Sequence, residues 1–141
     1  MSVSALNHYN IRPWDLEGTK DFYVDVVGLT IGYRPPVGFP GYWLYSGESA
    51  LVHLQGPRPG ETTPEPPAPG SAASTGYIDH IAFAAADLKG TRARLEARGV
   101  AFTERLVPRD GQTLVTVQDP MGVRVELVFE AAEADAPQAA K

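Results

Sequence analysis

The feature that most constrains the fold is an internal repeat, in which a pattern from the first half of the chain returns in the second half. Residues of the same type recur 72 positions further along, first in an alternating stretch and then at the start of a helical pattern. The matching pairs are His8 and His80, Asp15 and Asp87, Leu16 and Leu88, Gly18 and Gly90, and Thr19 and Thr91. Chance can align one pair of histidines, but it does not align a strand residue, a helix cap and helix positions together. The repeat therefore predicts a duplicated module.

The offset between the two halves drifts slightly after the helical pattern. It is 71 for the glycines and arginines that follow, and 73 at the end of each half. These later pairs are Gly28 and Gly99, Arg34 and Arg105, and His53 and Glu126. Small differences in loop length would produce such a drift. In the last pair, an imidazole in the first half is exchanged for a carboxylate in the second.

Each half reads as a strand, a helix and three further strands. In the first half, Leu6–Arg12 alternates between two faces, Asp15 suits a helix N-cap, and Gly28 suits the position after a helix. The segment between the halves is rich in proline and glycine and has almost no large apolar residues, which is typical of a linker. We therefore predict an α+β fold of two βαβββ modules forming a cupped mixed sheet. The modules span residues 1–56 and 77–130, the linker loop spans 57–76, and a disordered tail spans 131–141.

Composition narrows the classes of function. The chain has 141 residues, a net charge of −5 and a pI near 5.1, which argues against nucleic acid or an anionic membrane surface as a partner. It contains no cysteine, so thiolate metal sites, disulfides and cysteine nucleophiles are excluded. The sequence shows no signal-peptide pattern and no apolar run long enough to span a membrane, so we expect a cytoplasmic protein.

The repeat also predicts a functional site. Two such modules packed around a pseudo-twofold axis would direct their first and last strands toward a shared interior. The first module would then supply His8 and His53, and the second would supply His80 and Glu126. Three imidazoles and one carboxylate suit a divalent transition metal such as Zn, Ni, Mn or Fe(II). An incomplete shell would leave positions on such an ion for water or a small-molecule substrate.

Each of these four residues also has a structural interpretation. A single strand histidine is more often a hydrogen-bonded structural residue than a ligand, and it is the duplication that favours ligation here. Glu126 lies between Val125 and Leu127, where a buried carboxylate needs a partner. His53 could act as an unligated base instead of a ligand, because an imidazole titrates near neutral pH.

Three further residues are candidates for substrate binding. Arg12 and Asn10 share a strand face with His8, and Arg12 could either anchor an anionic substrate group or form a surface ion pair. Trp43 belongs to a set of aromatic residues near a proline- and glycine-rich loop. These residues, which could line a pocket or pack in the core or a dimer interface, are Trp14, Phe39, Tyr42, Trp43 and Tyr45.

Three motifs carry a resemblance to a known family. They are Phe22-Tyr-Val-Asp-Val-Val-Gly-Leu29, Asp79-His80-Ile-Ala-Phe83 and Asp119-Pro-Met-Gly-Val-Arg-Val-Glu126. In a chain of two βαβββ modules, these motifs resemble the vicinal oxygen chelate superfamily. This group includes glyoxalase I, methylmalonyl-CoA epimerase, fosfomycin-resistance enzymes, extradiol dioxygenases and bleomycin-resistance proteins. The resemblance covers residues 5 to 130.

The resemblance implies roles for individual residues. His8, His80 and Glu126 match the ligand positions that metal-using members of the superfamily most often fill. His53 stands where glyoxalase I has a glutamate that serves as catalytic base or fourth ligand. Arg12 matches in spacing an arginine with which glyoxalase I holds the carboxylate of its thiol cofactor.

Departures from individual members narrow the choice of activity. The residues after His53, Leu-Gln-Gly-Pro57, lack the asparagine expected for a glutathione site. The stretch upstream of Asp119 lacks the histidine and the tyrosine that extradiol enzymes carry there. Bleomycin-resistance proteins generally lack the metal ligands, which this chain keeps.

Together, these observations predict a metal-dependent enzyme, most simply a lyase or isomerase, acting on a small vicinally oxygenated substrate through a metal-stabilised enolate or oxyanion. Glu126 or His53 would move the proton. One alternative is an Fe(II)-dependent single-domain dioxygenase with His8, His80 and Glu126 as a facial triad. Another is a small-molecule or antibiotic-binding protein without catalysis. We expect a homodimer, since paired modules in this superfamily commonly build sites at such interfaces, and the linker permits pairing within one chain or exchange between two.

Overall fold

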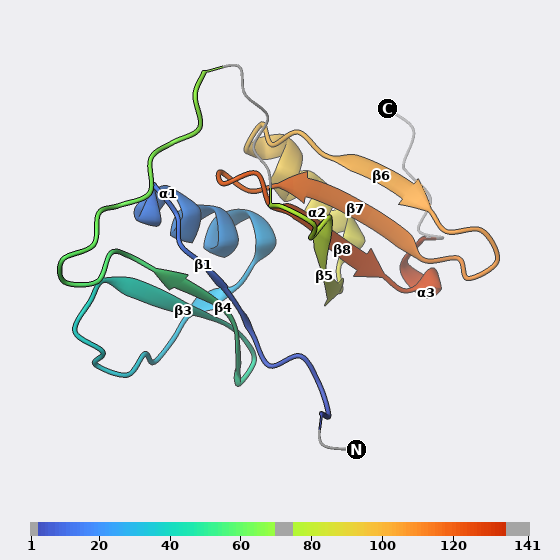
Figure 1. Cartoon of the computed structure of the whole chain (residues 1–141). Helices are drawn as coiled ribbons and strands as arrows, with labels where there is room; N and C mark the ends of the chain where they lie inside the picture. The colour runs from blue at the N-terminus through green and yellow to red at the C-terminus, as the bar shows by residue number, and fades with distance from the viewer. Residues whose placement is uncertain (1–2, 70–74, 135–141) are drawn as a thin grey trace. The chain divides into compact units, whose positions relative to one another are not determined.

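The computed structural model describes residues 3–69 and 75–134, and the chain divides into two compact units (Figure 1). The first unit spans Met1–Ala72 and the second spans Ala73–Lys141, so the division falls inside the proline- and glycine-rich segment. Each unit contains one four-stranded mixed sheet. This is the α+β architecture of two βαβββ modules that the repeat predicts.

In the first unit, a short strand leads into a helical segment and then into three further strands. The elements are β1 (Tyr9–Ile11), α1 (Leu16–Asp21), the π-helical η1 (Phe22–Val27), β2 (Thr30–Ile31), β3 (Gly41–Ser46) and β4 (Ser49–Gln55). Their order in the sheet is β1-β4-β3-β2, with β1 parallel to β4 and the other neighbours antiparallel. The first strand is shorter than its sequence alternation predicts, and His8 lies just before it.

The second unit repeats this topology. Its elements are β5 (His80–Ala85), α2 (Leu88–Ala97), β6 (Thr103–Leu106), β7 (Thr113–Gln118) and β8 (Arg124–Phe129). Their order is β5-β8-β7-β6, again with one parallel pair, β5 and β8, and antiparallel neighbours elsewhere.

The parallel strand pairs of the two sheets have equivalent registers. In the first unit, Asn10 of β1 lies opposite His53 of β4. In the second unit, Ala82 of β5 lies opposite Glu126 of β8. Asn10 and Ala82 are related by the offset of 72, and His53 and Glu126 are related by the offset of 73. The structure therefore confirms the repeat as a duplication of backbone geometry.

Both helices begin with the same cap, which explains why an aspartate and a glycine recur together. The carboxylate of Asp15 accepts a hydrogen bond from the backbone N–H of Gly18 at 2.9 Å, and Asp87 accepts one from Gly90 at 2.9 Å. A Cβ atom at either glycine would collide with the capping carboxylate. The aspartate and the glycine are thus required as a pair.

The change of offset from 72 to 71 arises inside the first helical segment. The sequence had suggested a difference in loop length instead. Tyr23 and Leu95 are equivalent positions. Beyond them, the N–H of Leu29 donates to the carbonyl of Tyr23 at 2.9 Å, whereas the N–H of Val100 donates to Leu95 at 3.0 Å. The first unit therefore fits one additional residue into the end of the helix, and the wider π turn of η1 accommodates it.

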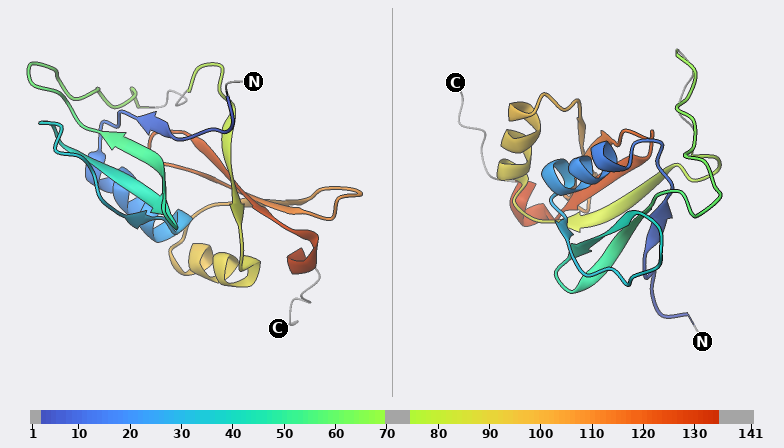
Figure 2. Two further views of the ribbon diagram at one scale, coloured as in Figure 1. Left: turned by 90° about the horizontal axis from the view of Figure 1, so that it is seen from below. Right: turned by 90° about the vertical axis from the view of Figure 1, so that its left-hand side faces the viewer.

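Each sheet has one buried face and one more polar face. In the second unit, the fully or nearly fully buried strand residues are Val115, Val117, Val125, Leu127 and Phe129. Thr116 and Glu126 alternate with them and point to the opposite face. Figure 2 gives two further views, in which each helix lies along one side of the sheet of its own unit. The polar face of the sheet is therefore the face on which ligands can bind.

The connecting and terminal segments add little regular structure. Residues 57–69 contain a turn but neither helix nor strand, and residues 70–74 of the predicted linker lie outside the described residues. The tail predicted to be disordered from residue 131 begins with a short helix, α3 (Ala131–Ala134), and alanine is the residue that favours helix most strongly. The rest of that tail lies outside the described residues. No helix in the described part of the chain is long and apolar enough to cross a membrane.

Candidate functional site

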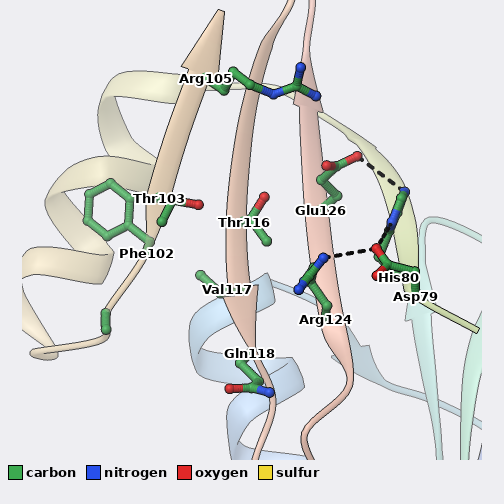
Figure 3. A pocket seen from close by; sticks show the side chains of 11 residues that line it. Asp79, His80, Phe102, Thr103, Arg105, Thr116, Val117, Gln118, Arg124 and Glu126 are labelled. Atoms are coloured by element: carbon green, nitrogen blue, oxygen red, sulfur yellow. Dashed lines mark hydrogen bonds and ion pairs between the residues drawn. The ribbon is translucent and has the colours of Figure 1, made fainter. Parts of the chain in front are cut away.

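In the second unit, a histidine and a carboxylate face each other across two parallel strands. His80 begins β5, Glu126 lies within β8, and both side chains are on the polar face of the sheet. Nε2 of His80 lies 3.6 Å from Oε2 of Glu126 (Figure 3). The side chains are 41% and 17% exposed, so both can be reached from solvent.

Asp79 and Arg124 fix the orientation of the His80 ring. Oδ1 of Asp79 lies 2.8 Å from Nδ1 of His80, and Arg124 donates a hydrogen bond to the same oxygen at 2.9 Å. The hydrogen bond to His80 and the charge of Arg124 hold the pKa of Asp79 below its usual value. Because Asp79 engages Nδ1, Nε2 is the nitrogen that faces Glu126. A carboxylate commonly orients a metal-binding histidine in this way.

The His80–Glu126 pair lines a concavity of about 620 Å³ on the polar face of the second sheet. Other polar residues that line it are Thr103, Arg105, Thr116, Gln118 and Arg124 (Figure 3). Neither Arg105 nor Arg124 is predicted from the sequence to belong to a site. The signal for Arg105 was present in the repeat, because its counterpart Arg34 lines the concavity of the first unit.

In the first unit, two of the predicted site histidines form a ring stack with Trp43. The ring centroids of His8 and His53 are 3.8 Å apart with an interplanar angle of 15°. Those of Trp43 and His53 are 4.0 Å apart with an angle of 6°. The three rings line a concavity of about 260 Å³ together with Asn10, Arg34 and Phe39. The structure therefore brings His8, His53, Asn10 and Trp43 together on the first unit.

The stack leaves His53 with one unsatisfied polar atom. Among the described residues, Nε2 of His53 is a buried side-chain nitrogen that makes no hydrogen bond. Burial lowers the pKa of His53, and the positive charge that His8 can carry lowers it further, while a hydrogen bond to the backbone of Ala50 acts in the opposite direction. These effects favour the neutral form of the His53 imidazole.

Arg12 does not share the surroundings of the ring stack. Its guanidinium forms an ion pair with Glu61 at 2.6 Å, and its side chain is 45% exposed. This is the surface ion pair that the sequence left open as the alternative for Arg12. Asn10, in contrast, donates a hydrogen bond to Oε1 of Gln55 at 3.2 Å, and both residues line the concavity of the first unit.

The two donor pairs differ in how well they fit a divalent metal ion. Two donors bonded to one ion at about 2.1 Å, with about 90–120° between the bonds, lie about 3.0–3.6 Å apart. The separation of 3.6 Å between His80 and Glu126 meets this condition. The stacked rings of His8 and His53 do not, because an ion in the plane of one ring lies outside the plane of the other.

Within residues 3–69 and 75–134, no three side chains of histidine, aspartate or glutamate gather into a metal-binding group. The arrangement that fits a metal is therefore the pair formed by His80 and Glu126. His8 is exposed and its ring stacks on His53, whereas His53 is enclosed between two rings.

Solved structures of known proteins share this fold. A lactoylglutathione lyase from Agrobacterium tumefaciens is 22% identical, with a TM-score of 0.64 over 94% of this chain and 98% of that chain. TnmS3, an antibiotic binding protein from a Streptomyces species, is 24% identical, with a TM-score of 0.59 over 92% of this chain and 98% of that chain. At these identities the likeness concerns the fold alone.

Sequence comparison identifies the family. No protein with a curated function matches the chain in sequence. A family model, described as the Glyoxalase/Bleomycin resistance protein/Dioxygenase superfamily, matches residues 5–127 and so covers most of the chain. The paired βαβββ modules agree with this match. The protein therefore belongs to the Glyoxalase/Bleomycin resistance protein/Dioxygenase superfamily.

Proposed function

We propose that this protein is a metal-dependent lyase or isomerase that acts on a small substrate with two neighbouring oxygen atoms. The observation that supports it most strongly is the 3.6 Å separation of Nε2 of His80 and Oε2 of Glu126, which suits two adjacent ligands of one ion. Asp79 adds support, because its bond to Nδ1 of His80 supplies the oriented imidazole that metal ligation requires.

His80 and Glu126 would hold the ion, and His8 is the third ligand that we propose. Zn, Ni, Mn and Fe(II) all accept imidazole and carboxylate donors. When bound, such an ion supplies Lewis-acid polarisation of the substrate oxygens. The chain itself would orient the substrate in the concavity of the second unit, where Thr103, Thr116 and Gln118 offer hydrogen bonds.

His53 is the residue we assign to proton transfer. Its lowered pKa keeps it neutral at neutral pH, and its buried Nε2 has no hydrogen-bond partner among the described residues. A neutral imidazole with a free lone pair is the form that a general base requires. The stack with His8 and Trp43 also fixes the plane of its ring, which argues for this role over that of a fourth ligand. Glu126 is the alternative proton carrier if His53 proves to be a ligand.

The assembly we propose is a homodimer. The two donor pairs could then combine within one chain or through modules exchanged between two chains. Mixing two variants distinguishes these possibilities. A dimer of one His8→Ala chain and one His80→Ala chain should bind metal if modules are exchanged, and should bind none if each chain builds its own site. A monomeric mass removes the exchanged version.

A second candidate is a binding protein that sequesters a small molecule without catalysis. It is favoured by the aromatic lining of the first concavity, where Phe39, Trp43 and His53 present flat surfaces. The antibiotic-binding activity named for TnmS3 makes this a reasonable alternative for the same fold.

Metal analysis combined with oxygen uptake separates the candidates. Near-stoichiometric Zn, Ni or Mn without oxygen uptake supports the lyase or isomerase. Fe(II) with substrate-dependent oxygen uptake would instead support a single-domain dioxygenase. Absence of metal from the purified protein, with ligand binding unchanged in His80→Ala, leaves the binding protein as the function.

A further inference from the structure

Arg105 places a positive charge in the concavity that holds His80 and Glu126. It lies on β6, where it pairs with Leu114 of β7, and Thr103 on the same strand face pairs with Thr116. Thr116 in turn pairs with Glu126, so all of these side chains are on the polar face of the sheet. Figure 3 shows the guanidinium of Arg105 extending from β6 across β7 toward β8.

The other charges of this concavity are already balanced. Arg124 forms an ion pair with Asp79 at 2.9 Å, and the same aspartate engages His80. Glu126 faces Nε2 of His80. Arg105, in contrast, forms no ion pair and no side-chain hydrogen bond within the described part of the chain, although it lines the concavity. The guanidinium of Arg105 is therefore free to donate hydrogen bonds to a ligand, and it lies in the same concavity as the residues that would hold the metal.

The repeat shows that this open state is specific to the second unit. The counterpart of Arg105 is Arg34, which lines the first concavity. There, Arg34 donates a hydrogen bond to the carbonyl of Phe39 at 2.9 Å, and its guanidinium lies 4.9 Å from the centroid of that ring. The duplicated frame thus uses one arginine to hold a loop and leaves the other available.

We propose that Arg105 binds a carboxylate of the substrate, so that the protein acts on small organic acids. This inference rests on the proposed function, because it takes the vicinal oxygens of the substrate to lie at His80 and Glu126. A guanidinium matches a carboxylate through two parallel N–H···O bonds. The hydroxyl groups of Thr103 and Thr116 line the same concavity and offer further donors.

Geometry limits the length of the substrate. β6 and β8 are separated by two strand spacings of about 4.8 Å each, so their backbones lie about 10 Å apart. The side chain of Arg105 spans part of that distance, and the carboxylate of Glu126 on β8 is directed toward His80 (Figure 3). A carboxylate a few bonds away from the vicinal oxygens therefore fits between the two ends.

The number of available guanidinium groups favours a carboxylate over a dianionic phosphate. Arg105 is the only arginine lining this concavity that has no carboxylate partner among the described residues. A phosphate dianion usually recruits several such donors, whereas one guanidinium suffices for one carboxylate.

The test uses two probes that differ only in the distal carboxylate. 2-Oxoglutarate and 2-oxopentanoate both carry the vicinal oxygens of a 2-oxo acid, and only the first has a second carboxylate. Calorimetric titration of Mn(II)-loaded protein should show 2-oxoglutarate binding at least about tenfold more tightly, the factor expected from one charge-assisted contact. Arg105→Gln should abolish this preference and leave the affinity for 2-oxopentanoate unchanged. Arg98→Gln, which changes the net charge equally on an exposed residue after α2, should retain it.

An equal affinity for both probes in the wild type, or a preference that persists in Arg105→Gln, overturns the inference. A separate titration tests Arg105 without any metal. Glutarate added to metal-free protein should shift the Nε–H resonance of Arg105 in a saturable manner, and no such shift overturns the inference. If glutarate binds at Arg105 while Mn(II) fails to strengthen the binding of either oxo acid, the anion site stands and the proposed metal function fails.

Discussion

Glu126 and His53 occupy equivalent positions in the two sheets. Each is paired, on the neighbouring parallel strand, with a residue that lies two positions after a histidine. Glu126 pairs with Ala82, two residues after His80, and His53 pairs with Asn10, two residues after His8. The duplication has therefore kept the frame and changed the chemistry. In one unit it presents an oriented imidazole beside a carboxylate, and in the other a stack of aromatic rings.

Replacing Asp79 by asparagine should weaken metal binding without removing it. Asp79 orients His80 through Nδ1 and is not itself a proposed ligand, and partners of this kind typically contribute about 10–100-fold to metal affinity. Titration of metal-free protein with Zn(II) measures the effect. Asp110→Asn, an exposed residue of the same unit, is the matched control and should leave the affinity unchanged. Equal affinity in Asp79→Asn and the wild type contradicts the positioning role.

His53→Gln should retain metal, whereas His80→Ala should lose it. The ring of His53 is enclosed between His8 and Trp43, where it cannot turn toward an ion shared with His8 without breaking the stack. Its contribution should instead appear in turnover, once a substrate is known. Metal content of the two purified variants gives the comparison. A loss of metal in His53→Gln as complete as that in His80→Ala would make His53 a ligand.

The cap of the first helix allows a test of the paired aspartate and glycine. Asp15→Ala should lower the free energy of unfolding by about 0.5–2 kcal/mol, because the N–H of Gly18 loses its acceptor. Gly18→Ala should also destabilise the protein, because its Cβ collides with the carboxylate of Asp15.

In the Asp15→Ala background that collision is absent. There, Gly18→Ala should be neutral or stabilising by up to about 1 kcal/mol, since alanine favours helix over glycine. Urea unfolding of the four proteins completes the cycle. Additive effects of the two substitutions would show that the glycine is not required by the cap.

Sequence reasoning predicts the frame of this protein well because the frame is duplicated. Histidines, helix caps and terminal glycines recur at nearly constant offsets, and those offsets reappear in the pairing registers of both sheets. The π turn at Phe22–Val27 was not predicted, because one extra residue changes the offset between the halves by one whether it lies in a loop or in a helix.

The side-chain arrangement of the site was less predictable. Nothing in the spacing of His8 and His53 indicates that their rings stack, since this depends on how Trp43 packs across the strand pair. In the sequence, Arg105 is recognisable only as the counterpart of Arg34. Whether its guanidinium has a carboxylate partner depends on the folded structure and cannot be read from the sequence. For Arg12, the partner Glu61 comes from the predicted linker, which periodicity does not place.

The ion pair between Arg92 of α2 and Glu104 of β6 should make stability depend on pH. Arg92 donates from Nε to Oε2 of Glu104 at 2.8 Å and from a second nitrogen to the other oxygen, and these bonds hold the pKa of Glu104 below its usual value of 4.5. Because the folded pKa is the lower one, the stabilisation is fully present above about pH 4.5 and is lost as the pH falls through the folded pKa.

Glu104→Gln should therefore cost about 0.5–1 kcal/mol at pH 7, the size expected of a partly exposed pair. The difference from the wild type should shrink toward zero at acidic pH. Chemical unfolding of both proteins at a series of pH values measures it. A difference that stays constant down to pH 3 would show that the effect comes from packing and not from the charge of Glu104.

The most direct measurement is the metal content of purified wild-type protein and of His80→Ala, determined by plasma mass spectrometry after reconstitution with Zn, Ni, Mn and Fe(II) in turn. The control is Gln118→Ala, which alters the same concavity without touching the His80–Glu126 pair. The proposed site predicts close to one divalent ion per functional site in the wild type and in Gln118→Ala, and almost none in His80→Ala. Binding of no ion by the wild type, or equal binding by His80→Ala, would contradict it.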